Sequence, residues 1–491
     1  MDRHSYGRGR SEKRQKKFKA VANDGSENEV LFTDVKILLK KWRESKSQDD
    51  RLLESREGLA KEKFSEIEVL ISELSSTGDG LGVADSQDHV YVVPFSVPGD
   101  KVVAKTVHQF PLYTMTDFIK VIKPGINRDD SLSKCPYFAK CAGCQLQMLP
   151  YDVQLAHKRS IVEKAYRNFS TLTPEVVPAV GETIGSPMQY GYRTKLTPHF
   201  DGPPGAMSRS WRKDPSKRKG LGEVPAIGFQ EKGRGRTIDI EDCPIGTDIV
   251  REGMQKERKR IARDFATYKK GATILLREST TRKPRLADNA TSAGSEVLES
   301  NITSTSEWKK GNEPTVGESN NVATSRHPHP YIDTKSCITD QRAESTEYVD
   351  SYIFKNTAGA FFQNNNSILP VFTAYIRDHV LPPKTSETSI KYLIDAYCGS
   401  GLFTVSLSTL FASSLGIDIA DASVTAARNN AQINAIRNAK FITADAAQLF
   451  KEVDFPADET AVVIDPPRKG CDDAFLKQLL RFGPQRVVYV R

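Results

Sequence analysis

The stretch Tyr392-Leu393-Ile394-Asp395-Ala396-Tyr397-Cys398-Gly399-Ser400-Gly401-Leu402-Phe403 decides the fold of the C-terminal part of the chain. Its apolar first half predicts a buried strand, and the apolar residues after Gly401 predict a helix. Glycines between a strand and a helix let the backbone approach a ligand beside a helix N-terminus. The stretch therefore predicts a ligand-binding turn, with a purely structural turn as the alternative.

Strands and helices alternate around this stretch. Strands are predicted at 392–396, 415–419, 441–443, 461–464 and 487–490, and helices at 402–411, 423–436 and 474–480. This rhythm is typical of a doubly wound α/β sheet.

Acidic residues end three of these strands. Asp418, seventeen residues after Gly401, is placed to accept hydrogen bonds from both hydroxyls of a ribose. The third glycine of a dinucleotide site is absent, which favours S-adenosylmethionine over NAD. Asp445 is placed to reach an adenine amine, and Asp465 precedes a stiff Pro-Pro loop. Arg468 follows that loop where amine methyltransferases often carry an aromatic residue, which leaves carbon methylation open.

Upstream, residues 63–125 contain short alternating strands separated by turns, at 66–71, 89–93, 101–104 and 113–121. This pattern favours a small closed barrel of the OB type, a fold that commonly binds RNA. Residues 130–355 mix loops and strands and form a central α+β domain. Within them, Ser, Thr, Asn, Glu and Pro dominate residues 279–330, which we interpret as a disordered insertion.

Residues 1–60 are interpreted as a basic, mostly disordered tail with one amphipathic helix around Leu31–Trp42. Residues 1–20 carry eight Lys or Arg against two acids, and a second basic cluster runs over 209–236. Both are candidate contacts for a polyanion, the alternative being solvated segments. The run at 14–19 resembles a nuclear address; a mitochondrial presequence is the less favoured alternative.

Three cysteines lie close together in the sequence, at Cys135, Cys141 and Cys144, and Cys243 is followed by a proline. Four thiols of this kind suit zinc or an iron–sulfur cluster, and the absence of histidine favours the cluster. Buried, unliganded thiols are the alternative, and this is our interpretation of Cys398 and Cys471.

Composition limits the classes of protein to which the chain can belong. The chain has 491 residues, a net charge of +8 and seven cysteines. It lacks both an apolar run long enough for a membrane span and a secretory N-terminus. We therefore expect an intracellular protein with reduced thiols, no membrane partner and several domains.

These residues resemble the RNA (uracil-5-)-methyltransferases, above all the fungal enzymes that act on the T loop of tRNA. The resemblance implies S-adenosylmethionine as cofactor, tRNA as partner, a monomer, a TRAM module at 63–125 and a methyltransferase domain at 356–491. Phe361-Phe362-Gln363-x-Asn365 matches the family signature, and Tyr190-x-Tyr192-Arg193-Thr194-Lys195 resembles its RNA-facing central strand. By the same resemblance, the cofactor residues are Gln363, Tyr397, Asp418 and Asp465, and the ligands of a 4Fe–4S cluster are Cys135, Cys141, Cys144 and Cys243.

The resemblance also implies a catalytic cysteine, in a Ser-Cys-Asn stretch directly after the strand 487–490, and a later glutamate base. Both would lie beyond Arg491, so the expectation is a C-terminally incomplete, inactive chain with no catalytic residue of its own. Three alternatives stay open: methylation of ribosomal RNA, a non-catalytic tRNA-binding chaperone, and an iron–sulfur sensor. The compartment, whether cytoplasm, nucleus or mitochondrion, is also open.

Overall fold

The computed structural model describes residues 24–45, 63–83, 89–203, 220–284, 331–381, 389–444, 450 and 453–490. The chain forms two compact units, Met1–Gly185 with Lys232–Arg234, and Ser186–Glu231 with Gly235–Arg491. The basic run at 1–20, residues 209–219 of the second basic cluster and Asp445 lie outside the described residues. Among the described helices, none has the length and apolar character that a membrane span requires.

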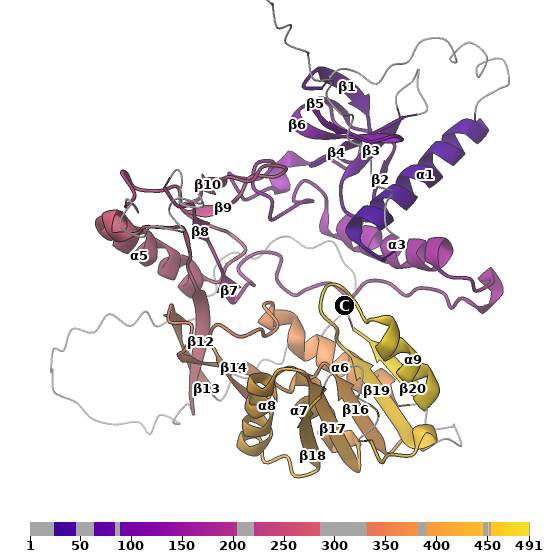
Figure 1. Ribbon diagram of the computed structural model, residues 1–491, viewed down its shortest axis with the longest axis vertical. Helices are drawn as coiled ribbons and strands as arrows, with labels where there is room; N and C mark the ends of the chain where they lie inside the picture. The colour runs from indigo at the N-terminus through magenta and orange to yellow at the C-terminus, as the bar shows by residue number, and fades with distance from the viewer. Residues whose placement is uncertain are drawn as a thin grey trace, which may run out of the picture. The chain divides into compact units, whose positions relative to one another are not determined.

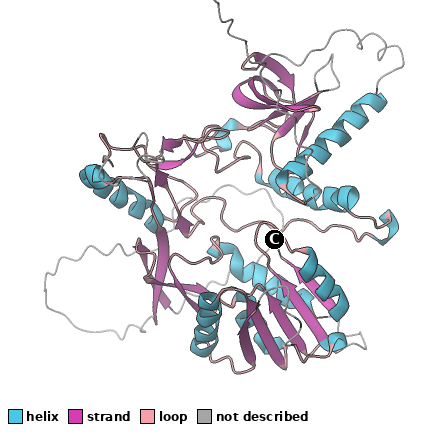
Figure 2. Ribbon diagram, in the orientation of Figure 1, coloured by secondary structure: helices cyan, strands magenta, loops and turns pink. Residues whose placement is uncertain are grey.

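A five-stranded sheet forms the C-terminal part of the second unit, and it confirms the α/β prediction (Figure 1). All four strand pairings are parallel. In spatial order the strands are β18 (Ala439–Thr443), β17 (Ser413–Asp418), β16 (Tyr392–Ala396), β19 (Thr460–Ile464) and β20 (Arg486–Tyr489). The helices beside them are α6 (Leu369–Val380), α7 (Leu402–Leu407), α8 (Asp421–Ile433) and α9 (Asp473–Phe482), all cyan in Figure 2. The predicted helix 402–411 is α7 followed by a 3₁₀ turn, η6 (Ser408–Leu410).

Alternate residues of the central strands enter two separate cores, because successive side chains of a strand point to opposite faces. Leu393 and Val463 pack in one core with residues of α6, α7 and α8. Ile394 and Val462 pack in the other with Phe475 of α9. The sheet is thus covered on both faces, as a parallel sheet requires.

The rest of the second unit is built from short strands and one long helix, α5 (Asp248–Asp264). A four-stranded sheet has the order β10 (Thr237–Asp239), β9 (Gly228–Gln230), β8 (His199–Phe200) and β11 (Ala272–Thr273). A three-stranded sheet has the order β13 (Tyr331–Ile338), β12 (Leu276–Pro284) and β7 (Lys195–Leu196), and β14 (Glu344–Val349) pairs with β15 (Tyr352–Thr357).

The predicted insertion starts too early. Residues 279–284 belong to β12, which pairs in an unbroken register with β13, from Arg277↔Ile338 to Pro284↔Tyr331. The pairing is reinforced by Arg282, whose guanidinium contacts Asp333 through two nitrogens at 2.7 and 2.9 Å. Polar composition misled the prediction, since Ser and Thr are also accommodated in a strand with one exposed face. Residues 285–330 lie outside the described part of the chain.

The first unit contains a six-stranded sheet, in which four strands overlap the predicted ones, whereas β2 (Glu73–Leu74) and β3 (Gly80–Val83) lie where the sequence indicated only a turn. The spatial order is β1 (Glu66–Leu70), β5 (Lys101–Gln109), β6 (Tyr113–Lys123), β4 (Val90–Val93), β3 and β2. The sheet curls, because Ser72, just past β1, donates to Leu81 of β3 at 2.8 Å. A side chain at Gly82 would clash with the Leu70 carbonyl, so this approach requires a glycine.

The predicted amphipathic helix is α1 (Glu27–Ser45). Leu31, Val35, Leu38 and Leu39 are buried against Leu81, Val90, Val92 and Tyr113 of the six-stranded sheet. Because its apolar stripe is covered, this part of the segment interpreted as a tail belongs to the core of the first unit.

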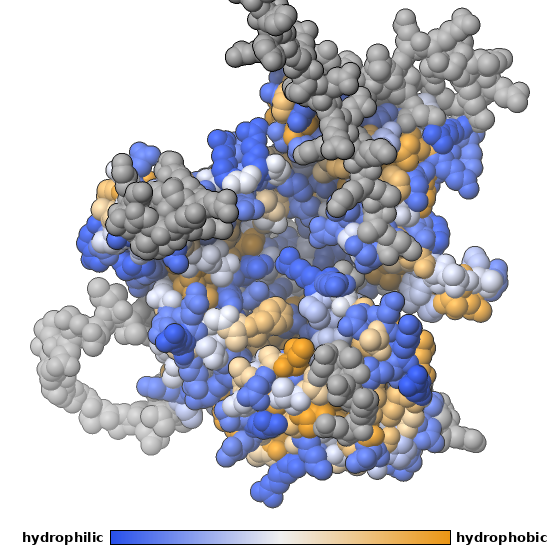
Figure 3. Space-filling model, in the orientation of Figure 1, coloured by the Kyte–Doolittle hydropathy of each residue, from blue (hydrophilic) through white to orange (hydrophobic). Residues whose placement is uncertain are grey.

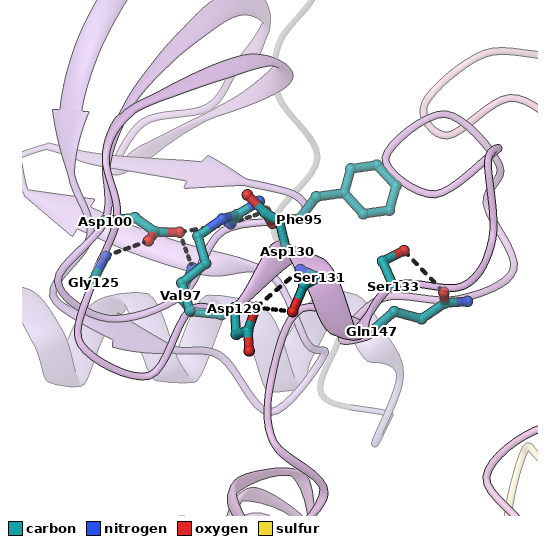
Figure 4. Close-up of polar contacts among 10 residues, drawn as sticks. Phe95, Val97, Asp100, Gly125, Asp129, Asp130, Ser131, Ser133 and Gln147 are labelled. Atoms are coloured by element: carbon teal, nitrogen blue, oxygen red, sulfur yellow. Dashed lines mark hydrogen bonds and ion pairs between the residues drawn. The ribbon is translucent and has the colours of Figure 1, made fainter.

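Hydrogen bonds fix the base of the loop that holds three cysteines (Figure 4). Asp129 N–H donates to Met148 O at 2.8 Å, and Ser133 Oγ donates to Gln147 Oε1 at 3.1 Å. The buried guanidinium of Arg128 contacts Asp100 at 2.9 Å, which ties this base to the turn after β4. After the loop the chain continues into α3 (Tyr151–Phe169).

Candidate functional site

A cavity of about 240 Å³ opens at the carboxyl ends of β16 and β17. Ligands of open α/β sheets bind at this edge, since the loops that follow the strands converge there. Two of the predicted cofactor residues, Tyr397 and Asp418, line it together with Ile417, Ile419, Ala444, Pro467, Lys469, Gly470, Cys471 and Asp472.

The glycine-rich turn borders this cavity and has an unusual backbone. Tyr397, Gly399 and Gly401 have φ values of +62°, +53° and +89°, in the left-handed region that glycine adopts at little cost. Tyr397 is not a glycine, and strain of this kind is concentrated at functional sites. The adjacent strand β17 stabilises the turn, because Gly399 N–H donates to Oδ2 of Asp418, the last residue of that strand, at 3.0 Å.

Asp418 has both oxygens oriented by backbone amides, since Ala420 N–H donates to Oδ1 at 2.8 Å. Each carboxylate oxygen accepts more than one hydrogen bond, so lone pairs remain for a ligand at the cavity wall. The acid at the end of the second strand therefore lies where the sequence predicted it.

Asp465 and Gln363 lie side by side: Nε2 of Gln363 donates to Oδ2 of Asp465 at 3.1 Å. Burial raises the pKa of Asp465, and the hydrogen bond from Gln363 opposes that rise. Asp465 follows β19 directly, two residues before Pro467 of the cavity wall. The structure thus brings together two predicted residues from distant parts of the sequence.

Asp395 is fully buried under the glycine-rich turn. The backbone and hydroxyl of Thr404 both donate to its Oδ2, at 2.9 and 2.6 Å, whereas Oδ1 has no hydrogen-bond partner among the described residues. Burial raises the pKa of Asp395 to about 7, and the neighbouring Asp465 and Asp418 add to the rise. The sequence analysis treated Asp395 only as part of a strand.

The thiols near the cavity are not activated. Burial raises the pKa of Cys398 well above its ordinary value and also raises that of Cys471, against a hydrogen bond with Tyr397. Both are therefore neutral at physiological pH and poor nucleophiles. Cys398 is buried, as interpreted, whereas Cys471 is only partly buried and lines the cavity.

The signature around Gln363 has its two aromatic residues in different environments. Phe362 is buried in the core below the sheet, whereas Phe361 is 72% exposed. Lys195 Nζ donates to the carbonyls of Gly359 and Ala360, both at 2.9 Å. The predicted central strand is short, since β7 holds only Lys195 and Leu196, and Lys195 contacts the signature loop.

A buried ion pair supports the other end of this loop. Glu347 of β14 contacts the guanidinium of Arg277 of β12, and the two side chains are 3% and 1% exposed. The second carboxylate oxygen of Glu347 accepts a hydrogen bond from Asn366, three residues after Gln363, at 3.3 Å. Sequence reasoning missed this pair, since neither residue belongs to a motif.

All seven cysteines lie among the described residues, and none is in a disulfide. Burial raises the pKa of the Cys141 thiol, and the neighbouring Cys144 and Cys135 add to the rise electrostatically. Gly143 N–H donates to Cys141 Sγ at 3.4 Å, and this hydrogen bond opposes the rise. Cys243 belongs to the second unit. In the described part of the chain, no three His, Cys, Asp or Glu side chains are grouped closely enough to hold a metal ion.

The open parallel sheet, the glycine-rich turn and the acid on the adjacent strand define a Rossmann-like methyltransferase fold. The chain belongs to the tRNA (uracil-5-)-methyltransferase family, whose model matches residues 338–491. It is 41% identical over 479 residues to the tRNA (uracil(54)-C(5))-methyltransferase of Schizosaccharomyces pombe, covering 97% of this chain and 76% of that protein.

Two further proteins are similar. The tRNA (uracil(54)-C(5))-methyltransferase of Saccharomyces cerevisiae is 38% identical, over 86% of this chain and 65% of its own length. The crystal structure of the Pyrococcus abyssi tRNA (uracil-54, C5)-methyltransferase, in complex with S-adenosyl-L-homocysteine, superposes with a TM-score of 0.51. It covers 86% of this chain and 90% of that one, at 22% identity, which supports the fold.

Proposed function

We propose that this protein transfers the methyl group of S-adenosylmethionine to carbon 5 of uridine 54 in the T loop of tRNA, forming 5-methyluridine. The cavity bounded by the glycine-rich turn and Asp418 carries the proposal, because its place at the strand ends and its acid suit an adenosine. The two fungal relatives, named for this reaction, support the choice of substrate.

The residues of the cavity have separate roles in cofactor binding. S-adenosylmethionine supplies an electrophilic methyl group on a sulfonium. The carboxylate of Asp418, fixed by two backbone amides, accepts the ribose hydroxyls, while Ile417, Ile419 and Tyr397 contact the adenosine. Gln363 and Asp465 face the methionine part, where a carboxylate suits the positive charge.

Carbon 5 of uracil is a weak nucleophile until a thiolate adds to carbon 6. Cys398 and Cys471, both neutral, are not suited to that addition. By family resemblance the nucleophile belongs to the segment that follows β20. Asp465 and its Pro-Pro loop would hold the uracil, which must leave the folded T loop to reach the cavity.

The six-stranded sheet of the first unit is proposed as an OB-like TRAM module that binds tRNA. Its curled strands and the matching position in the sequence support this assignment. The protein would act as a monomer. The basic run at 14–19 supports a nuclear as well as a cytoplasmic location, with mitochondria as the alternative.

A 4Fe–4S cluster on Cys135, Cys141, Cys144 and Cys243 is also proposed. Four thiols outside any disulfide and an amide directed at one sulfur suit the cluster chemically. In the described part of the chain their side chains do not form a closed ligand set. Anaerobic purification, iron analysis and visible absorbance test the proposal. Cys141→Ser should abolish the bound iron, and a wild-type protein without iron would refute the cluster.

The function is tested by incubating the purified protein with methyl-labelled S-adenosylmethionine and tRNA transcripts. The segment that follows β20 is included in that protein, because the nucleophile is assigned to it. Label is expected in tRNA and not in a transcript with cytidine at position 54. Label in ribosomal RNA transcripts instead would favour the ribosomal alternative. Tight tRNA binding without any label would favour a non-catalytic RNA-binding protein.

A further inference from the structure

Residues 422–444, which form most of α8, the following turn and β18, contain no acidic residue. With 62 acids among 491 residues, about three would be expected in these 23 positions. The segment carries Arg428, Arg437 and Lys440 instead, which makes it positive by three charges. A charge bias of this kind attracts polyanions.

The three cations gather around one groove. It lies between α8 and β18, has a volume of about 760 Å³, and is lined by Arg428, Ala431, Gln432, Ala435, Ile436, Arg437, Ala439, Lys440, Phe441 and Ile442. All three cationic residues are exposed. Within the described part of the chain, none of them contacts an acid, so their charges are available to a ligand.

The walls of the groove suit a chain of phosphates. Arg428 Nη2 donates to Phe441 O at 2.7 Å, which fixes one guanidinium along the strand. Ala431, Ala435 and Ala439 leave the groove open between the cations. Figure 3 shows hydrophilic and hydrophobic side chains mixed around α8 on the face in view, and Ile436, Phe441 and Ile442 add apolar surface to the groove beside the three cations.

The groove also begins next to the cofactor cavity. Ile442 of β18 lines the groove, and Ala444, two residues further along the chain, lines the cavity. Two residues of extended chain span about 7 Å. Since β18 is the outermost strand of its sheet, the groove follows an open edge that leads away from the cavity (Figure 1).

We propose that this groove binds the phosphodiester backbone of the RNA substrate, outside the nucleotide that is methylated. The inference rests on the proposed function and adds a second RNA contact to it, in the methyltransferase domain. An acidic peptide that pairs with the open edge of β18 is the competing occupant.

The experiment compares the wild-type protein with an Arg437→Gln/Lys440→Gln variant. Binding of a tRNA transcript is followed by fluorescence anisotropy at several salt concentrations. Each lost phosphate contact should lower the slope of log K against log salt by about 1, so the variant should lose about 2 and bind several-fold more weakly. Lys477→Gln, an exposed charge change on α9 at the other face of the sheet, is the matched control and should keep the slope.

Two further readouts separate the possible failures. S-adenosylmethionine affinity and the melting temperature should be equal in wild type and variant, since the groove residues lie outside the cofactor cavity. If wild type binds tRNA and the variant has the same slope and affinity, the groove proposal is wrong and an acidic partner becomes the better choice. If wild type itself does not bind tRNA, the proposed function fails.

Discussion

Gln363 and Asp465 are 102 residues apart in the sequence, and the side-chain amide of one donates to the carboxylate of the other at 3.1 Å. The contact joins the signature before the sheet to the loop after β19. It also affects the titration of Asp465, because burial raises the pKa of this acid and the amide opposes the rise. Gln363, which is assigned to cofactor binding, therefore also lowers the pKa of Asp465, a second residue with the same assignment.

Replacing Gln363 should shift the pH dependence of cofactor binding. In Gln363→Ala the pKa of Asp465 rises further, so the carboxylate is lost at a higher pH. Because S-adenosylmethionine is positively charged at sulfur, its affinity should fall by about tenfold or more at the acid end of the pH range and by less at the alkaline end. Isothermal titration across pH measures this. A uniform loss at every pH would contradict the coupling.

Asp418→Asn should weaken S-adenosylmethionine binding by about tenfold or more. The amide nitrogen replaces one of two oxygens that accept backbone hydrogen bonds, so it both loses an acceptor and disturbs the turn at Gly399. Asp421→Asn is the matched control, since Asp421 is exposed and accepts a hydrogen bond from the hydroxyl of Thr443 at 3.1 Å. Equal affinities of the two variants would remove Asp418 from the ribose site.

Asp395 should make the protein less stable as the pH rises from about 4 to 7. Its pKa of about 7 in the folded state lies above the ordinary carboxyl value, so the folded state holds the proton longer than the unfolded state does. The stabilisation is complete at acid pH and is lost as the pH rises through that range. The lost free energy of unfolding is on the order of 4 kcal/mol for a shift of this size.

Asp395→Asn tests this directly, because the amide keeps an acceptor for Thr404 and does not ionise. The difference in unfolding free energy between variant and wild type should grow in favour of the variant between pH 5 and pH 8. Urea unfolding at the two pH values measures it, and a constant difference would show that Asp395 does not titrate there.

Glu347→Gln should destabilise the second unit by about 3–5 kcal/mol, because it leaves the buried guanidinium of Arg277 without a counter-charge. Glu344→Gln on the same strand is the control, since its pair with Lys355 is exposed and should contribute less than about 1 kcal/mol. Urea unfolding of both variants and of Arg277→Met/Glu347→Leu checks the prediction. The double variant should recover most of the stability.

Leu39→Ala should cost about 2–5 kcal/mol if α1 is part of the first unit, because this side chain is 2% exposed against the six-stranded sheet. Lys40→Ala, at the next and exposed position, should change stability by less than about 0.5 kcal/mol. Equal melting temperatures would show that the helix does not stabilise the sheet.

Local patterns were sufficient for most of the fold. The strand of Tyr392–Ala396 was predicted to the residue, and the other strands of its sheet within about two residues, since a buried parallel strand is a continuous apolar run. The same reasoning failed at residues 279–284, where polar strand residues have the composition of a loop. There only the register with β13 reveals the strand.

The candidate site likewise contains residues that the sequence predicted and contacts that only the folded structure reveals. Asp418 follows from spacing, because the carboxyl ends of neighbouring parallel strands meet at one edge of the sheet, whereas Tyr397 was assigned by the family resemblance. Three features have no sequence signature: the hydrogen bond between Tyr397 and Cys471, the Asp395 oxygen that has no partner among the described residues, and the ion pair of Arg277 with Glu347. Each depends on side chains from elements that become neighbours only in the folded chain.

The sequence by itself determined the class of the protein, since strand periodicity, a glycine-rich turn and an acid one strand later are local properties of the chain. Tertiary structure alone decided the electrostatics of the site. Burial depth and the approach of Gln363 set the pKa of Asp465, and burial sets that of Asp395. A pKa depends on everything that surrounds a group, and those surroundings come from residues far apart in the sequence.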